Sequence, residues 1–204
     1  MKKTIFSLVI ALLCLVNLNA QDKADDTNTN KWQMRFRVLA ITPSPGDDIE
    51  GADVDISTSY IPELDFTYFF DKNWAAELIL ATSKHEVDVE GTDLGRVWLL
   101  PPTLSLQYHF AGGEVKPYVG AGVNYTIFYG IKSGDAADMD YDNTFGFSFQ
   151  AGLDYILSDK WFLNLDVKKI LLSTDVNVDT GEGILPVDVD VNPLVIGIGV
   201  GMKF

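Results

Sequence analysis

The chain has 204 residues and a formal net charge of −14, with 29 acidic against 15 basic side chains. This excess of acid argues against nucleic acid as a partner, because surfaces that bind phosphate backbones are rich in lysine and arginine. Hydrophobic residues make up 47% of the chain, yet after the N-terminal region no run reaches the roughly 18 apolar residues that a membrane-spanning helix needs.

Residues 1–20 predict a cleaved secretory signal. Lys2 and Lys3 precede an apolar stretch from Ile5 to Val16, and Leu18-Asn19-Ala20 offers a cleavage site. Twelve apolar residues are too few to span a bilayer. Cleavage would remove both lysines and so change the formal charge from −14 to −16.

The only cysteine, Cys14, lies within that apolar stretch. A lipoprotein anchored through Cys14 is an alternative, which the bulky Leu13 before it disfavours. Cleavage after Ala20 would instead leave a mature chain with no cysteine, so disulfides are excluded.

Residues 21–31 are polar and predict a flexible N-terminal segment, whereas residues 32–204 predict one barrel domain. Within the latter, apolar and mixed side chains alternate with the period of two that is typical of strands. The alternation occupies eight segments: 32–41, 63–70, 74–81, 98–110, 117–129, 145–157, 161–168 and 194–204.

The links between these segments are alternately short and long. The short links are 71–73, 111–114 and 158–160, and the long links are 42–58, 82–96, 130–143 and 172–190. Such alternation is typical of bacterial outer-membrane barrels, with their short periplasmic turns and long extracellular loops. We therefore predict an all-β fold, an eight-stranded antiparallel transmembrane β-barrel in the outer membrane of a Gram-negative-type cell.

Aromatic residues gather at the segment ends, which predicts a girdle at each membrane interface. The periplasmic girdle would contain Trp32, Phe70, Trp74, Phe110, Trp161 and Phe204, and the extracellular one Tyr60, Trp98, Tyr125, Tyr129 and Phe145.

Two sequence blocks are similar to the outer membrane protein W family. These are Leu100-Pro101-Pro102-Thr103-Leu104 and the Pro-Tyr-Val-Gly-Ala-Gly-Val-Asn-Tyr-Thr run at 117–126, with weaker matches at 152–155 and 192–194. The resemblance covers Trp32 to Phe204. It implies an eight-stranded outer-membrane barrel whose narrow, largely apolar lumen admits small hydrophobic molecules.

The same resemblance assigns Ile79 and Lys168 to the positions where an aliphatic and an aromatic side chain narrow the bore in channel members. Lys168 departs from that pattern, because a cation replaces the expected tryptophan. Leu39 and Phe162 are expected to line the lumen as apolar residues.

The inward faces also carry charges, which predict a paired internal network because unpaired buried charge is costly. Its expected members are Arg35, Arg37, Glu63, Asp65, Glu77, Lys116, Asp154, Asp166 and Lys203, with Lys168 beside them. Inward glycines such as Gly152 and Gly201 either leave space in the lumen or allow strand curvature and tight closure. A sealed interior is therefore an alternative to a transport path.

The long links are acidic and predict solvated loops that bind divalent cations at most loosely. Residues 138–142 resemble a calcium loop only briefly, because its glycine and terminal glutamate are missing. No metal site and no cofactor are predicted. Ser105 and His109 share a face about 13 Å apart, too far for a catalytic hydrogen bond, so we predict no enzymatic activity.

We predict a small outer-membrane channel that passes small hydrophobic or amphipathic molecules by passive diffusion, along the barrel or laterally through its wall. The alternative is a non-transporting barrel for structure, adhesion or stress response, with the acidic loops as its working surface. Expected partners are outer-membrane lipid, lipopolysaccharide, a small hydrophobic ligand and the barrel assembly machinery. By resemblance to other such barrels, that machinery would act on Phe204.

Overall fold

The computed structural model describes residues 31–43, 54–56, 58–89, 92–133, 138–179 and 184–204. The predicted signal, nearly all of the predicted N-terminal segment and some acidic link positions such as Asp47 and Asp48 lie outside these ranges. The described strands are β1 (Trp32–Thr42), β2 (Val54–Ile56), β3 (Ser59–Phe69), β4 (Trp74–Ala81), β5 (Ser83–Val89), β6 (Thr92–Leu100), β7 (Thr103–His109), β8 (Val115–Ser133), β9 (Asp138–Tyr141), β10 (Thr144–Ile156), β11 (Trp161–Leu171), β12 (Ser173–Asp179), β13 (Ile184–Asp190) and β14 (Leu194–Lys203).

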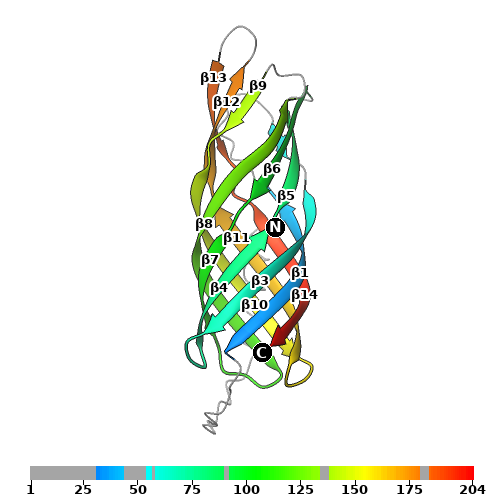
Figure 1. Cartoon of the computed structure of the whole chain (residues 1–204), viewed down its shortest axis with the longest axis vertical. Helices are drawn as coiled ribbons and strands as arrows, with labels where there is room; N and C mark the ends of the chain where they lie inside the picture. The colour runs from blue at the N-terminus through cyan, green and yellow to red at the C-terminus, as the bar shows by residue number, and fades with distance from the viewer. Residues whose placement is uncertain (1–30, 44–53, 57, 90–91, 134–137, 180–183) are drawn as a thin grey trace, which may run out of the picture.

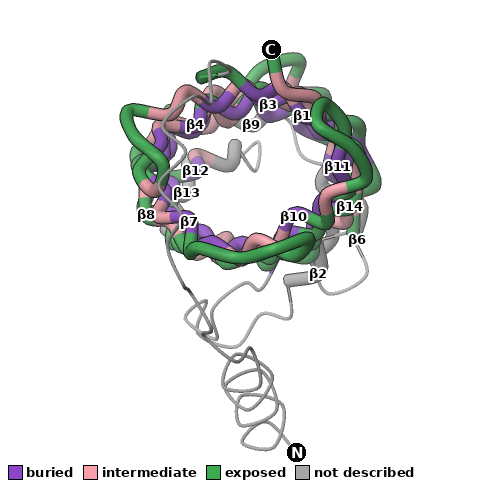
Figure 2. Tube along the Cα trace, turned by 90° about the horizontal axis from the view of Figure 1, so that it is seen from below, coloured by how far each residue is buried: buried purple, intermediate pink, exposed green. Residues whose placement is uncertain are grey.

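Eight of the described strands form a closed antiparallel ring in the order β1, β3, β4, β7, β8, β10, β11 and β14 (Figures 1 and 2). The ring closes where β14 pairs with β1, from Lys203 opposite Gln33 to Leu194 opposite Thr42. The predicted eight-stranded barrel is therefore confirmed. Within the described ranges, no helix is long and apolar enough to cross a membrane.

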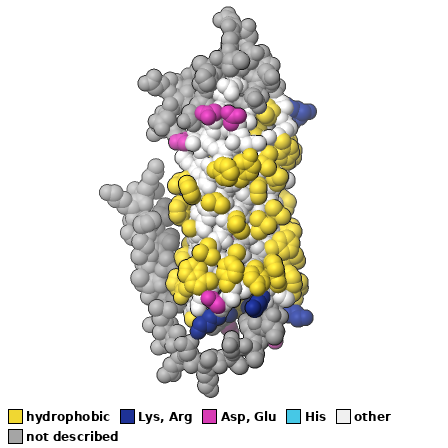
Figure 3. Space-filling model, turned by 60° about the vertical axis from the view of Figure 1, so that its left-hand side comes forward, with side chains coloured by type: hydrophobic (Ala, Val, Ile, Leu, Met, Phe, Trp, Pro, Cys, Tyr) yellow, Lys and Arg dark blue, Asp and Glu magenta, His cyan; other side chains and the backbone are white. Residues whose placement is uncertain are grey.

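The barrel has a polar interior and an apolar outer surface. Along β11, buried and exposed residues alternate without exception from Trp161 to Lys168. The inward Arg35 and Glu77 are 0% exposed, whereas the outward Phe147 and Ile198 are 63% and 66% exposed. A soluble protein shows the reverse arrangement, and the resulting outer band of hydrophobic side chains suits contact with lipid (Figure 3).

Aromatic side chains pack against one another at both margins of this apolar band. At the end with the short turns, the ring centroids of Trp32 and Tyr68 lie 4.8 Å apart. At the other end, those of Tyr125 and Phe145 lie 4.6 Å apart. The positions match the two girdles expected from the sequence. Hereafter the end with the short turns is called the lower end, as in Figure 1, and the opposite end the upper end.

The long links contain strands of their own that continue the wall above the apolar band. β5 pairs with β6 and β2, and β12 pairs with β13 and β9. The segment expected as one strand over 98–110 is split into β6 and β7 at Pro101 and Pro102. Proline lacks the N–H that a ladder hydrogen bond requires, which explains the interruption.

Candidate transport site in the barrel lumen

Two arginines of β1 organise a buried network of ion pairs in the lower half of the lumen. Arg35 Nε donates to Asp65 Oδ1 at 2.8 Å and Arg35 Nη2 donates to Glu77 Oε1 at 3.0 Å. Arg37 Nε donates to Glu63 Oε1 at 2.5 Å, and its Nη2 lies 2.9 Å from Asp65 Oδ2. All five side chains are at most 2% exposed, so their charges depend on one another for compensation.

Neutral side chains extend this network to the other walls. Gln150 Nε2 donates to Glu77 Oε2 at 2.8 Å, Tyr118 Oη donates to Asp166 Oδ2 at 2.7 Å, and Asn164 Nδ2 donates to Asp154 Oδ1 at 2.8 Å. We call this whole set the polar network: Arg35, Arg37, Glu63, Asp65, Glu77, Tyr118, Gln150, Asp154, Asn164 and Asp166.

The polar network crosses the full width of the bore. The guanidinium carbon of Arg35 on β1 lies 5.4 Å from the centroid of the Tyr118 ring on β8. These two strands are four positions apart in a ring of eight, and so they form opposite walls. The lumen is therefore closed by side chains at this level.

Two inward glycines make room for large rings and do not open the lumen. A Cβ added at Gly152 would lie 2.4 Å from Tyr118 Cζ, and one added at Gly201 would lie 2.2 Å from Phe162 Cζ. Both rings are buried. Of the two sequence-based interpretations of these glycines, tight closure applies at both positions.

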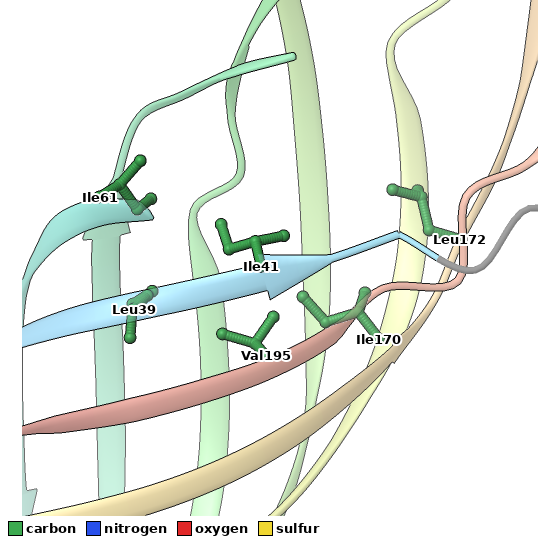
Figure 4. Close-up of a cluster of buried hydrophobic side chains, with 6 residues drawn as sticks. All are labelled: Leu39, Ile41, Ile61, Ile170, Leu172 and Val195. Atoms are coloured by element: carbon green, nitrogen blue, oxygen red, sulfur yellow. The ribbon is translucent and has the colours of Figure 1, made fainter. Parts of the chain in front are cut away.

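Apolar side chains replace the charges on the inner wall of the upper half (Figure 4). This apolar cluster consists of Leu39, Ile41, Ile61, Ile170, Leu172 and Val195. On β1 and β3 the change from charged to apolar takes place between one inward residue and the next. On β1 the next inward residue above Arg37 is Leu39, and on β3 the next inward residue above Glu63 is Ile61. Leu39 and Ile61 lie directly opposite each other.

Lys168 stands at the boundary between the two halves. Its side chain is buried, and its backbone pairs with Val195 of the apolar cluster. The nearest carboxylate oxygen is Asp166 Oδ1, 3.7 Å from Nζ. Among the described residues, no hydrogen bond from Lys168 Nζ is present.

The wall beside the apolar cluster has an incomplete hydrogen-bond ladder. β3 and β4 pair up to Glu63 opposite Ala81. Above that pair β3 continues through residues 59–62, and in the described part of the chain no pairing joins this stretch to β4 or β5. Ala81, at the end of the ladder, packs against the apolar cluster. We call this interval between β3 and β5 the seam.

The structure separates the four residues predicted to line or narrow the bore. Ile79 on β4 and Lys168 on β11 are inward and lie on opposite walls of the ring. Leu39 belongs to the apolar cluster. Phe162 pairs with Gly201, which pairs with Arg35, so Phe162 lies at the level of the polar network. That Ile79 and Lys168 form a constriction stays a prediction.

Among the predicted charged members, two lysines at the lower end stay outside the ion pairs, although Lys116 lies directly opposite Asp154 in the β8–β10 ladder. Lys203 Nζ lies 5.8 Å from the Phe162 ring centroid, and neither Lys116 nor Lys203 forms an ion pair with a described residue. Phe204 exchanges backbone hydrogen bonds with Trp32 where the barrel closes. Recognition of Phe204 by the assembly machinery stays a prediction.

Ser105 and His109 have separate partners. His109 Nε2 lies 3.0 Å from Gln107 Oε1, and Ser105 Oγ lies 3.5 Å from Ser148 Oγ. The His109 ring stacks on Tyr118, with centroids 4.9 Å apart. His109 therefore borders the polar network as a hydrogen-bonding and packing residue.

The sequence pattern predicted the charged members of the network, but it predicted neither the neutral members nor most of the apolar cluster. Tyr118, Gln150 and Asn164 each lie two or four residues from a charged or glycine position on the same strand face. Alternation therefore placed them inward, but it could not indicate which carboxylate each would meet.

Comparison with known proteins identifies the chain. A family model described as the OmpW family matches residues 31–204. The chain belongs to the OmpW family. It is 44% identical over 182 residues to an uncharacterized outer-membrane protein, y4mB, of Sinorhizobium fredii, covering 85% of this chain and 80% of that protein.

Two further relatives of this OmpW-family chain bear on its function. The dibenzothiophene metabolism operon protein PahQ of Pseudomonas aeruginosa is 28% identical over 210 residues, covering all of this chain and 99% of that protein. The crystal structure of the outer membrane protein OprG from Pseudomonas aeruginosa superposes with a TM-score of 0.79 at 30% identity, covering 86% of this chain and 96% of that one. The protein is thus an outer-membrane barrel, and its lower end with the short turns corresponds to the periplasmic side.

Proposed function

We propose that this barrel takes up small hydrophobic or amphipathic molecules from the extracellular side by passive diffusion. The observation that carries the proposal is the apolar cluster on the inner wall directly above the polar network. Apolar surface facing a lumen is costly to hydrate, and it attracts apolar solutes. The proposal requires no catalytic step.

The polar network makes an axial route to the periplasm unfavourable. A molecule moving down the bore would have to separate Arg35 or Arg37 from their carboxylates. Breaking one buried ion pair costs about 3–5 kcal/mol, and an apolar solute would not replace the lost hydrogen bonds. We therefore infer that solutes leave the lumen above the network.

The seam supports a lateral exit at that level. Between residues 59–62 of β3 and the start of β5 the described wall lacks ladder pairing, so parting the strands there breaks fewer hydrogen bonds than elsewhere. Ile61 of the apolar cluster lies in this stretch. A solute on the cluster would thus reach the lipid-facing surface next to Pro62, which has no N–H to pair.

The relatives favour the same class of solute. PahQ is named for an operon of dibenzothiophene metabolism, and dibenzothiophene is an apolar fused aromatic compound. We use it as the test probe.

The test is the initial rate of dibenzothiophene uptake by intact Gram-negative cells that produce the barrel or an empty vector. Intact cells are needed because apolar solutes cross plain phospholipid bilayers unaided. Cysteines at Pro62 and Thr82 across the seam would be joined by a short bifunctional methanethiosulfonate reagent. Uptake should fall to the vector level and recover when the link is reduced.

The matched control joins cysteines at Leu64 and Leu80, which are paired partners one step below on β3 and β4. Those strands are already hydrogen-bonded, so linking them should leave uptake unchanged. Equal uptake with the seam linked and open would reject the lateral route. No uptake above vector by the unmodified barrel would favour the alternative of a non-transporting structural or adhesive barrel, for which the closed bore is the supporting observation.

A second variant pair tests the apolar cluster itself. Ile41→Thr with Val195→Thr adds two hydroxyl groups and should lower dibenzothiophene uptake several-fold. Val195→Thr nearly conserves volume, whereas Ile41→Thr also makes the side chain smaller by one heavy atom. The control, Ala75→Ser, adds a hydroxyl to a buried residue of the lower half, where the proposed path does not run.

A further inference from the structure

Three basic side chains form a cluster on the outer surface near the extracellular end. They are Lys84 on β5, Arg96 on β6 and Lys132 on β8, hereafter the rim cluster. Arg96 lies directly opposite Lys132 in the β6–β8 ladder. The buried residues Ser83, His85 and Val97 flank Lys84 and Arg96, so alternation turns these two side chains outward. Lys132 is itself exposed.

Arg96 and Lys132 lie just above the extracellular aromatic girdle, and Lys84 pairs with Trp98 at the level of the girdle itself. Trp98 and Tyr129 belong to that girdle, with ring centroids 6.3 Å apart. Arg96 is two residues beyond Trp98 and Lys132 three beyond Tyr129, or about 7 and 10 Å along the strands. Aromatic girdles lie at the interface between hydrocarbon and headgroups, so the three cations are at headgroup level.

A bulge in β8 sets the direction of Lys132. Two residues, Gly130 and Ile131, oppose the single Val97 on β6. Gly130 has φ +60°, and an added Cβ would lie 3.0 Å from Trp98 Cδ1. A glycine in this left-handed conformation is a recognised form of bulge. The extra residue returns Lys132 to the face of Arg96.

Among the described residues, the charges of the rim cluster are only partly compensated. Lys84 Nζ lies 2.7 Å from Glu86 Oε1. This hydrogen bond and the nearby Arg96 lower the pKa of Glu86, which therefore stays ionised. Glu86 lies directly opposite Arg96 in the β5–β6 ladder, and in the described part of the chain it is the one carboxylate that forms an ion pair with the rim cluster. On the other side Arg96 is opposite Lys132, and like charges in that arrangement destabilise a ladder.

The rest of the extracellular rim has the opposite charge. Asp142 and Asp175 are exposed, and Asp142 N–H donates to Asp175 O at 3.1 Å. The chain as a whole has a net charge of −14. The concentration of three cations in one sector, with a single ion pair to a described carboxylate, therefore indicates a specific anionic neighbour.

We propose that the rim cluster binds the phosphate groups of lipopolysaccharide in the outer leaflet. The guanidinium of Arg96 would accept a phosphate in a two-bond arrangement, while Lys84 and Lys132 would act as point charges beside it. An outer-membrane barrel has this lipid as its permanent neighbour at the height of the cluster. The inference depends on the membrane location and is independent of the proposed uptake.

The test measures binding of lipopolysaccharide to the purified full barrel in detergent at low salt. The triple variant Lys84→Gln, Arg96→Gln, Lys132→Gln should bind about tenfold or more weakly, because each basic residue contributes near an anionic surface. Binding to the unmodified barrel should also weaken as salt is raised. Lipopolysaccharide with its phosphates removed should bind the unmodified barrel no better than the triple variant binds the intact lipid.

The matched control is Lys31→Gln, Lys72→Gln, Lys160→Gln, which removes the same charge from exposed positions at the periplasmic end. It should retain binding within about twofold of the unmodified barrel. The single Lys132→Gln variant should give an intermediate loss, and each variant's folding is checked by its heat-dependent gel mobility.

Equal binding by the rim triple and the unmodified barrel would overturn the proposal, as would equal weakening by the control triple. Full binding of the dephosphorylated lipid would show that phosphate is not the recognised group. Displacement of the lipid by millimolar inorganic phosphate, but not by sodium chloride at the same ionic strength, would assign the cluster to free phosphate and would also contradict the proposal.

Discussion

The lower and upper parts of the wall formed by β1, β3, β11 and β14 have opposite chemistry on their inner face. In the lower half, Arg35 and Arg37 join carboxylates from several walls in a network that crosses the bore. In the upper half, apolar side chains cover the inner wall formed by β1, β3, β11 and β14. On β1 the change occurs between Arg37 and Leu39, about 7 Å apart along the strand.

Closure of the lumen and binding of a solute therefore belong to different levels of one barrel. The charged side chains compensate one another, and they present no apolar surface on which an apolar solute could bind. The apolar side chains have no such partners, and their exposure toward the lumen favours apolar contact. Substitutions in the lower half should therefore act mainly on stability, and those in the upper half mainly on uptake.

The largest difference should appear between Arg37→Met and Leu39→Met, two inward positions on the same strand. Arg37→Met leaves Glu63 and Asp65 with less compensation and should lower the free energy of unfolding by about 3–5 kcal/mol. Leu39→Met nearly conserves volume and should cost less than about 1.5 kcal/mol. Urea unfolding in lipid vesicles, followed by tryptophan fluorescence, measures both. Equal costs would remove the distinction between the halves.

A smaller difference should separate two glycines of β14. In Gly201→Ala the new Cβ would meet the buried ring of Phe162 at 2.2 Å, whereas in Gly197→Ala it would meet the flexible end of Leu39 at 2.7 Å. Overpacking in the lower half should cost about 1–3 kcal/mol. The upper substitution should cost less, because Leu39 can change rotamer. The same unfolding experiment measures the loss in the free energy of unfolding for both variants. A larger loss in Gly197→Ala than in Gly201→Ala would contradict tight closure at Gly201.

Lys168→Met should act on uptake more than on stability. Removing the ammonium group extends the apolar surface downward by one position. If this lowers the free-energy barrier to passage of the solute by about 1 kcal/mol, the rate of dibenzothiophene uptake should rise roughly fivefold. The control is Lys169→Met, the adjacent outward residue, whose Nζ donates to Asn192 O. Unchanged uptake in Lys168→Met would place the solute path away from this boundary.

Alternation along the sequence was enough to identify the barrel and the inward charges. It could not give the distances between their charged atoms, so Lys116 and Lys203 were grouped with residues with which, in the described part of the chain, they form no ion pair. Nor could it give partners, because Arg35 and Asp65 meet only through the register of β1 and β3.

The apolar cluster was hidden for a different reason. Leu39-Ala40-Ile41 is apolar on both faces, so the inward members of this run look like the outward ones. Some strands above the membrane were not predicted, because they lack an apolar row facing lipid. β9 and β12, with sequences DMDY and STDVNVD, are examples.

The smallest expected effect tests whether the apolar lining continues into that upper extension. Tyr141 on β9 pairs with the buried Val176, and its ring stacks on Phe128 with centroids 5.3 Å apart. Burial disfavours the phenolate and raises the pKa of Tyr141 to about 12. An unfolded chain would release this proton near pH 10. The contribution of Tyr141 to stability is therefore complete below about pH 10 and is lost as pH rises toward 12.

The difference in ultraviolet absorbance between the folded barrel and its Tyr141→Phe variant isolates this titration. Phe128→Ala should admit water and move the pKa of Tyr141 back toward 10. Titration near pH 10 in the unmodified barrel would mean that water fills the upper interior, and the contrast between the two halves would then end at the membrane surface.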